Sequence, residues 1–210
     1  MGYIMLLFTY LIIGVEAIAQ RLKRKIEETF LKAKKVKGIT LWDNLYYTPG
    51  HIWLKREKGK TTKIGIDDLV AKLIVKADGV VFPEKGKSIK SGEKAIKILL
   101  ENETISIPVP VSGKVLSVNR ALERDPYRIT RDPFGAGWII KMSAENGEFK
   151  NLLTGEKAEK WMEREIENLN SMLSTEAGIT AADGGEISSR GLRRIDKEKR
   201  VEIIKKFLKA

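Results

Sequence analysis

The sequence predicts an α+β fold: a flattened half-barrel, or sandwich, of antiparallel strands with flanking helices, and one N-terminal transmembrane helix. From residue 41 to residue 142 the apolar residues form short runs that are separated by glycine, proline and charged turns. Short strands at this spacing favour a barrel or sandwich of antiparallel sheets. After residue 147 the apolar residues recur at helical spacing, and residues 2–19 form an apolar segment of membrane-spanning length.

Seven short strands are expected in the central region. The first two form a hairpin closed by residues 57–60, and Asp67 or Asp68 can cap a short helix over residues 69–73. A long amphipathic helix is expected after residue 147, with apolar residues from 158 to 173 on one face. The expected strands are residues 52–55, 61–66, 79–82, 95–100, 104–109, 113–118 and 138–142.

The composition indicates one main domain with appendages and excludes several kinds of site. The chain has 210 residues, 42% of them hydrophobic and 32% charged. Because it has no cysteine, a disulfide framework, a thiolate metal site and a cysteine nucleophile are excluded. His51 is the single histidine, so no multi-histidine metal centre is expected. Lysine and glutamate dominate the charged residues, which fits a thermophilic source.

The first 20 residues are expected to form a single membrane anchor. Residues 2–19 are apolar apart from Thr9, Tyr10 and Glu16, and their number is near the lower limit for crossing a bilayer. Basic residues follow this segment but do not precede it, and the positive-inside rule then leaves the main domain in the cytoplasm. The chain is therefore expected to be a single-pass protein of the cell membrane. The basic residues are Arg21, Lys23, Arg24 and Lys25.

Two alternatives for this segment stay open. The tripeptide at residues 17–19, Ala-Ile-Ala, has the small residues of a signal-peptide cleavage site. An uncleaved helix lying in the membrane interface is the other alternative.

A basic juxtamembrane helix is expected over residues 21–40. Leu22, Ile26, Phe30 and Ala33 recur at helical spacing. Residues 20–37 contain eight basic and two acidic residues, a net charge of +6 out of +11 for the chain. Basic residues near an anionic bilayer contribute about 1 kcal/mol each, so membrane lipid is an expected partner. The alternative is a solvated helix face, and nucleic acid is not expected because recognition elements are not interleaved with the basic run.

The C-terminal residues 174–210 are expected to be a flexible linker followed by an attachment helix. Residues 174–191 are rich in Ala, Gly and Ser, which is typical of linkers. Residues 196–208 form an amphipathic helix whose apolar stripe would bind a partner protein. The alternatives are that this helix packs on its own domain or lies on the bilayer. The stripe consists of Val201, Ile204, Phe207 and Leu208.

Several motifs between residues 47 and 173 resemble one known family. They are YTPGHIW at residues 47–53, GIDD at 65–68, PEKG at 83–86, PVSG at 110–113 and DPFGAGW at 132–138. Together they resemble the glycine cleavage system H protein. The resemblance implies a lipoyl/biotinyl-type hammerhead domain, assigned to residues 41–173, and other protein subunits as partners. In that family a lysine on an exposed hairpin tip carries a lipoyl group.

The carrier lysine is missing from this sequence. Gly92-Glu93 and the PVSG segment align without a gap with the ends of the family's hairpin, so its Glu-Ser-Val-Lys-Ala motif falls on residues 99–103. Asn102 takes the place of the lysine. Its side-chain amide cannot be acylated as an amine can, so no cofactor is expected. Lys94 and Lys97 are the alternative positions for an atypical modification.

The other residues whose types often take part in catalysis or ligand binding are expected to have structural roles. His51 is expected to be packed or hydrogen-bonded rather than catalytic. Ser106 and Ser112 lack a nearby base, and the glycines at residues 135–137 indicate a turn rather than a phosphate-binding loop. The chain is therefore not expected to be an enzyme.

Three hypotheses for the function remain. The first is a non-catalytic, non-lipoylated accessory or assembly subunit of a membrane-associated complex. The second is a lipoyl-type carrier that uses an atypical lysine. The third is a basic adaptor for lipid or nucleic acid.

Overall fold

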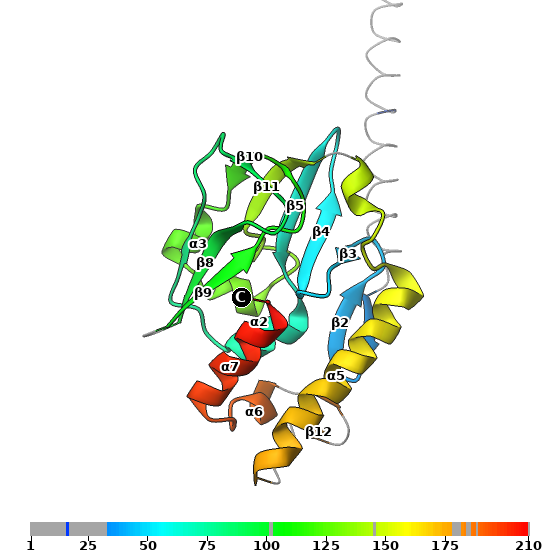
Figure 1. The fold of residues 1–210 in the computed structure, drawn as a ribbon, viewed down its shortest axis with the longest axis vertical. Helices are drawn as coiled ribbons and strands as arrows, with labels where there is room; N and C mark the ends of the chain where they lie inside the picture. The colour runs from blue at the N-terminus through cyan, green and yellow to red at the C-terminus, as the bar shows by residue number, and fades with distance from the viewer. Residues whose placement is uncertain are drawn as a thin grey trace, which may run out of the picture. The chain divides into compact units, whose positions relative to one another are not determined.

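The computed structural model describes residues 16, 33–100, 103–144, 146–177, 182–183, 186–187 and 189–209, and residues 34–210 form one compact unit (Figure 1). The expected membrane anchor and the basic residues Arg21, Lys23, Arg24 and Lys25 lie outside the described residues, except for Glu16. The anchor and the juxtamembrane cluster therefore stay predictions. No helix within the described ranges is long and apolar enough to cross a membrane.

Two antiparallel sheets form the body of the compact unit, as the sequence predicts for an α+β fold. The larger sheet has six strands in the order β3-β4-β5-β11-β10-β7, and the smaller has the order β6-β8-β9. The larger sheet contains β3 (Tyr46–Tyr47), β4 (Ile52–Arg56), β5 (Thr61–Ile66), β11 (Ile140–Ala144), β10 (Gly113–Val118) and β7 (Ser88–Ile89). The smaller contains β6 (Gly79–Val81), β8 (Lys94–Leu100) and β9 (Glu103–Pro108).

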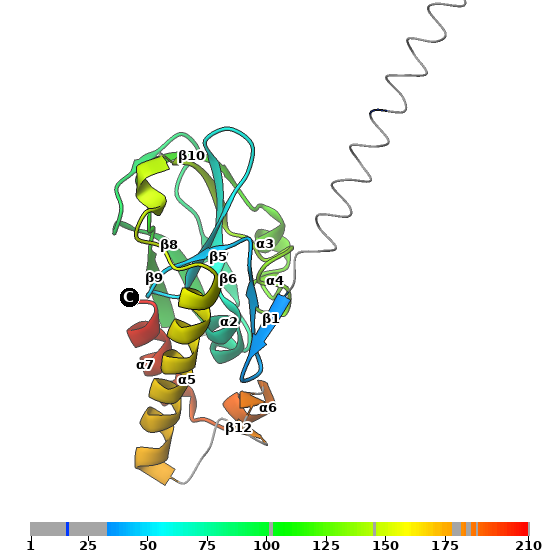
Figure 2. The ribbon, with the colours of Figure 1, turned by 90° about the vertical axis from the view of Figure 1, so that its right-hand side faces the viewer.

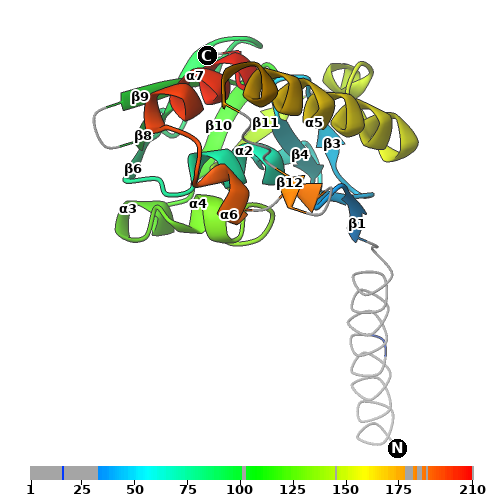
Figure 3. The same ribbon diagram turned by 90° about the horizontal axis from the view of Figure 1, so that it is seen from below.

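Helices flank the two sheets. Figure 3 shows α5 and α7 along one side of the compact unit, and α3, α4 and α6 along the other, with the strands between them. The helices are α2 (Asp68–Ile74), α3 (Ala121–Arg124), α4 (Arg128–Arg131), α5 (Gly155–Ala177), α6 (Ser189–Leu192) and α7 (Lys197–Phe207). A 3-10 helix, Asn146–Phe149, precedes α5.

The seven expected strands are confirmed as β4, β5, β6, β8, β9, β10 and β11, with ends that differ by up to two residues. Alternation along β8 explains why this strand could be predicted: Ile96 and Ile98 are buried, whereas Lys97 between them is exposed. The short helix is confirmed too. Asp67 is its N-cap, and its carboxylate accepts a hydrogen bond from the backbone N–H of Val70.

The expected juxtamembrane helix is wrong where the structure describes it. Residues 33–36 form strand β1 (Ala33–Val36), which pairs with β2 (Ile39–Trp42). Lys37 and Gly38 have φ angles of 45° and 87°, which end any helix there. A Cβ atom on Gly38 would lie 2.6 Å from the carbonyl oxygen of Ile187, so the close approach of two segments also requires glycine.

The expected linker is also corrected in its described part. Helix α5 continues to Ala177, and β12 (Ala182–Asp183) pairs with β13 (Glu186–Ile187). The N–H of Ile187 donates to the carbonyl of Lys37, and the side chains of Ile187 and Leu192 are buried. These apolar side chains anchor a segment whose composition alone indicates flexibility.

Helix α7 packs on its own domain, which corrects the expectation of a free partner-binding stripe. It lies against α2 (Figures 1 and 2). Its apolar side chains are already buried within the same chain. A partner protein that bound this stripe would therefore remove almost no further apolar surface from water. The exposed fractions are 7% for Val201, 1% for Ile204, 3% for Phe207 and 0% for Leu208.

Candidate functional site

The β8–β9 hairpin is the first candidate site, because the sequence motifs predict that its tip corresponds to the carrier position of the family that the sequence resembles. The antiparallel register pairs Ile98 with Ile105, Leu99 with Thr104 and Leu100 with Glu103. Residues 101 and 102, which connect the two strands, lie outside the described residues. The assignment of Asn102 to the lysine position therefore stays a prediction from the sequence.

The two alternative lysines lie within β8. Lys97 pairs with Val81 of β6 and with Ser106 of β9, so it belongs to the middle of the three-stranded sheet. Lys94 pairs with Pro108, at the end of the hairpin that is remote from residue 102. Both side chains are exposed. At about 3.3 Å per residue, the Cα atom of Lys97 lies about 10 Å along the strand from that of Leu100.

Helix α7 lies beside the end of this hairpin. The ammonium group of Lys205 on α7 is 2.8 Å from the Oε2 atom of Glu103, the first residue of β9. The hydrogen bond from Lys205 lowers the pKa of Glu103 below its usual value. Leu100, the last residue of β8, shares a small hollow with Val201 and Ile204 of α7. The C-terminal helix thus contacts both strands next to the tip.

A buried histidine forms the second candidate site. His51 has a φ angle of 56° and no solvent exposure. Its Nδ1 atom lies 2.8 Å from Oδ2 of Asp67, whose other oxygen caps α2. Its Nε2 atom lies 3.5 Å from Oε2 of Glu165 on α5, a distance that allows ionic attraction but exceeds good hydrogen-bond geometry.

The two carboxylates determine the charge of His51. Burial alone lowers the pKa of the imidazole, because a low-dielectric environment disfavours the charged form. The charge of Asp67 and its hydrogen bond, followed by the contacts with Glu165, outweigh burial and raise the pKa to about 9. His51 is therefore protonated at neutral pH, and its Nδ1–H donates to Asp67.

Aromatic rings enclose this charged pair. The ring of Phe207 stacks on His51 with a centroid distance of 4.8 Å and an interplanar angle of 27°. The Trp161 ring approaches His51 at 4.9 Å from α5. A catalytic residue must reach its substrate. Because His51 is fully enclosed, the structure supports the expectation of a packed, hydrogen-bonded histidine.

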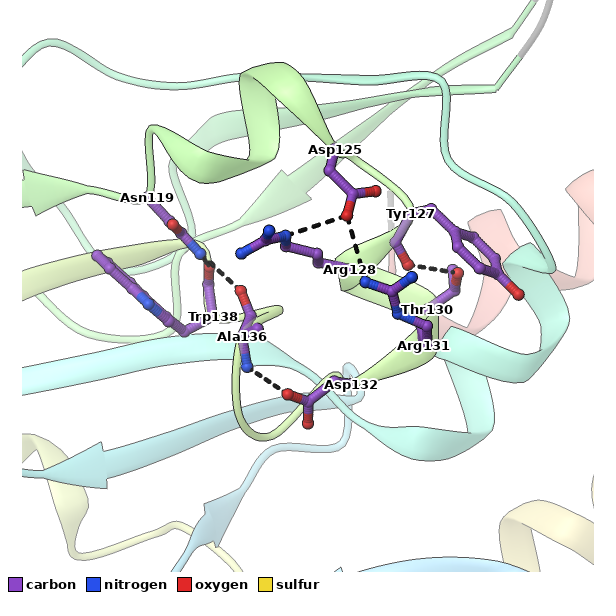
Figure 4. Close-up of polar contacts among 9 residues, drawn as sticks. All are labelled: Asn119, Asp125, Tyr127, Arg128, Thr130, Arg131, Asp132, Ala136 and Trp138. Atoms are coloured by element: carbon purple, nitrogen blue, oxygen red, sulfur yellow. Dashed lines mark hydrogen bonds and ion pairs between the residues drawn. The ribbon is translucent and has the colours of Figure 1, made fainter.

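The glycine-rich segment at residues 132–138 forms a braced turn (Figure 4). The carboxylate of Asp132 accepts a hydrogen bond from the N–H group of Ala136 at 2.6 Å. It accepts a second one from the N–H group of Gly135 at 3.0 Å. The side-chain amide of Asn119 donates to the carbonyls of Ala136 and Trp138. Because these N–H groups already have an acceptor within the turn, they are not arranged to cradle a phosphate. The interpretation as a turn is confirmed.

The short helices beside this turn are held by local ion pairs (Figure 4). Asp125 binds the guanidinium groups of Arg128 and Arg131 at 3.1 and 3.2 Å. The hydroxyl of Thr130 donates to the carbonyl of Tyr127. These contacts stabilise α4 and add no reactive group. Across the described ranges, no group of three or more His, Asp or Glu side chains is placed to hold a metal ion.

Comparison with known proteins decides the family. A model of the glycine cleavage H-protein family matches residues 45–165, which is more than half of the chain. The chain belongs to the glycine cleavage H-protein family. The match includes both sheets from β3 to β11 and ends within α5. Helices α6 and α7 therefore lie outside the matched residues.

Two relatives and one solved structure support the H-protein assignment. The probable glycine cleavage system H protein of Aeropyrum pernix is 39% identical over 115 residues, covering 54% of this chain and 80% of the relative. The probable H protein 2 of Saccharolobus solfataricus is 31% identical over 138 residues, covering 64% and 88%. A crystal structure of an H protein from Mycobacterium marinum supports the fold, with a TM-score of 0.51, 24% identity and coverage of 59% and 97%.

None of the residues around His51 was identified from the sequence as its partner. Glu165 lies on the polar side of an amphipathic helix, where a carboxylate is usually solvated. Phe207 belongs to a separate helix near the C-terminus. The neighbouring sequence indicated only the capping role of Asp67, because an Asp before an apolar helical segment is a common N-cap.

Proposed function

We propose that this H-protein-family chain is a non-catalytic accessory or assembly subunit that carries no lipoyl group. It is anchored at the cytoplasmic face of the cell membrane by residues 1–20 and belongs to a larger membrane-associated complex of other protein subunits. The observation that carries the proposal is Asn102 at the position of the family's carrier lysine. An asparagine amide offers no amine for the acylation that attaches a lipoyl group.

The surroundings of position 102 support a non-carrier role. In the family motif a serine stands where this chain has Leu100, and an alanine stands where it has Glu103. Leu100 is 6% exposed and belongs to the core, while Glu103 pairs with Lys205. The residues next to the tip thus bind the chain's own C-terminal helix.

The membrane part of the proposal rests on the sequence. Residues 2–19 have the apolar character of an anchor, and the basic cluster that begins at Arg21 favours a cytoplasmic domain. Membrane lipid is therefore one proposed partner. The family assignment favours other protein subunits as a second class of partner.

Washing native membranes with alkaline carbonate tests the anchoring. The chain should stay in the pellet with the integral proteins, and a pull-down after mild solubilisation should recover defined subunits with it. A mature protein that begins at Gln20 in an exported fraction would contradict the proposal, because it would show cleavage of a signal peptide.

A carrier that uses an atypical lysine is the alternative, favoured by the exposure of Lys94 and Lys97. Peptide mass spectrometry over residues 94–115 separates the two functions. Unmodified lysines support the accessory role, whereas a lipoyl adduct on either lysine would establish the carrier.

A further inference from the structure

Strand β9 forms a free edge of the smaller sheet. The sheet order β6-β8-β9 leaves one side of β9 without a neighbouring strand. Helix α7 lies beside this strand, where Lys205 contacts Glu103 (Figures 1 and 3). A free edge presents unpaired N–H and C=O groups, and proteins usually protect it with charged residues, bulges or proline. In β9 only the end residues, Glu103 and Pro108, are of this kind, and residues 104–107 between them are uncharged.

The hydrogen bonds around β9 show which backbone groups face its free side. Just after the strand, the N–H of Val109 donates to the carbonyl of Glu93, and the carbonyl of Val109 accepts from the N–H of Gly92. Because successive residues of a strand direct their backbone groups to opposite sides, those of Thr104 and Ser106 point away from β8. In the part of the chain that the structure describes, no backbone group on that side bonds to these two residues.

A groove opens beside the start of this edge. It has a volume of about 330 Å³ and lies between the first residue of β9 and one side of α7. An extended chain laid along β9 would therefore also contact α7. Because α7 lies beyond the family match, the residues of the family fold alone do not form this groove. The groove is lined by Glu103, Lys197, Glu198, Val201, Glu202 and Lys205.

Lys97 places a positive charge on the outer face of this sheet. It is exposed and lies opposite Ser106, whose side chain is small. Among the described residues, Lys97 has no ion-pair partner. A strand added beside β9 would place a side chain next to Ser106, two interstrand distances or about 10 Å from the backbone of Lys97. The long lysine side chain can reach across serine, so an acidic residue is favoured at that position.

We propose that β9 binds an extended, acidic segment of a partner subunit as an additional antiparallel strand. Strand addition of this kind gains affinity from main-chain hydrogen bonds and specificity from alternate side chains. The antiparallel direction continues the pairing of β6, β8 and β9. The added segment pairs with Thr104 and Ser106 and directs its acidic residues toward Lys97. This inference rests on the proposed accessory function and names the kind of partner segment that the subunit recognises.

Peptide binding by residues 34–210 tests the proposal, because these residues form a compact unit with their own core. The probe is a fluorescein-labelled peptide, Ser-Val-Glu-Val-Glu-Val-Ser, followed by fluorescence anisotropy. We expect the parent chain to bind it. Ser106→Pro should bind it roughly 10-fold less tightly, because proline removes an outward N–H donor. Pro108 occupies an equivalent position in β9, so melting curves should show that this variant folds.

Two isomeric peptides separate strand addition from other kinds of binding. In the proposed register the two glutamates direct their N–H groups to β9, whereas the valines direct theirs away from it. N-methylation of the two glutamates should abolish binding, and N-methylation of the first two valines should leave it nearly unchanged. These peptides need no protein variant, so the result does not depend on how Ser106→Pro folds.

A pair of lysine variants tests the charge. Lys97→Gln should weaken binding of the acidic peptide about threefold, because it removes the cation that faces the glutamates. Lys58→Gln removes an exposed lysine from the turn between β4 and β5, in the other sheet, and should leave binding unchanged. Equal losses in the two variants would contradict the role of Lys97.

No binding of the acidic peptide, equal binding of the two methylated peptides, or tighter binding of a peptide with lysines in place of the glutamates would overturn the proposal. A dimer of residues 34–210 that Ser106→Pro disrupts would also overturn it, because the edge would then serve a second copy of the chain. The proposed accessory function can fail separately. A lipoyl adduct on the native protein would contradict that function without changing peptide binding, and a failure of peptide binding leaves the assignment of Asn102 intact.

Discussion

Nδ1 of His51 lies 2.8 Å from Oδ2 of Asp67, and neither side chain is exposed to solvent. Through this contact the turn at residues 48–51 is connected to the N-terminus of α2, because Asp67 also caps that helix. Glu165 of α5 and the ring of Phe207 complete the surroundings of the imidazole. One histidine therefore links α2 and α5 to the C-terminal segment that lies beyond the family match.

The raised pKa of His51 predicts a loss of stability at alkaline pH. The pKa is raised from 6.5 to about 9 in the folded chain. The stabilisation is fully present below pH 6.5, where both folded and unfolded chains hold the proton, and it is lost as the pH rises through about 9. The free energy of unfolding should fall by about 3 kcal/mol over this interval.

Urea unfolding of residues 34–210 between pH 6 and pH 10 measures this effect. The control is His51→Gln, which cannot gain the proton. This variant should be less stable than the parent at pH 6 and should lack the alkaline step that depends on His51. The same pH dependence in both proteins would show that other groups cause it.

Phe207→Ala should destabilise the compact unit. The phenyl ring is 3% exposed and stacks on His51, so its removal leaves a cavity beside a buried charge. Phe→Ala substitutions in cores cost about 3–5 kcal/mol. Urea unfolding provides the measurement, with Lys206→Ala as the exposed neighbour that should change stability little. If the two variants were equally stable, α7 would not be part of the folded core.

Val75 occupies a strained turn after α2. Its φ and ψ angles are 62° and −57°, and the N–H of Lys76 donates to the carbonyl of Ile74 at 2.6 Å. This is the γ-turn with positive φ, which is rare and strained, and is especially unfavourable for a β-branched residue. Relief of strain worth about 1–3 kcal/mol should therefore offset much of the cost of Val75→Gly.

The matched control for Val75→Gly is Val80→Gly. Val80 is also partly buried, but it lies in strand β6 and is not among the residues with positive φ. The free energy of unfolding of the Val75 variant should exceed that of the Val80 variant. The reverse order in chemical denaturation would indicate that the turn is not strained.

Asn102→Lys alone should not restore efficient lipoylation. The flanking residues Leu99, Leu100 and Glu103 differ from the family motif, and Leu100 is needed in the core. The assay is modification of purified residues 34–210 by a lipoate ligase, with a lysine-bearing H protein as the positive control. Modification of the variant at the rate of the control would show that a lysine at position 102 is sufficient.

Much of the strand pattern could be predicted because β8, β9 and β11 show local alternation of buried and less buried residues. Ile96, Lys97 and Ile98 of β8 show which residues face the core before any partner strand is known. The cap at Asp67 and the turn at residues 135–137 are local as well. The family motifs gave the position of Asn102 relative to the hairpin ends.

The predictions from the sequence were wrong for two segments whose structure depends on contacts with residues distant in the sequence. Ala33 continues a helical pattern in the sequence, but the segment it begins is a strand, and the following turn contacts Ile187 through Lys37 and Gly38. The Ala, Gly and Ser content of residues 174–191 could not reveal that Ile187 is buried. Long-range packing overrides local preference in both cases.

The position of α7 could not be predicted for a similar reason. Its amphipathic pattern shows that one face must be buried, but the pattern does not tell which surface covers that face. The contact of Phe207 with His51 joins residues from opposite ends of the compact unit's sequence. The partner-binding expectation and both of its alternatives, packing on the same domain and lying on the bilayer, were compatible with the same stripe.

The intact mass of the chain purified from its native cells tests the absence of a lipoyl group most directly. Because the sequence motifs assign Asn102, which has no amine, to the carrier position, we predict a single species with no lipoyl adduct, even when the lipoylated proteins of the same cells are fully modified. A species that carries one lipoyl group would contradict the non-carrier role and identify this H-protein-family member as a carrier.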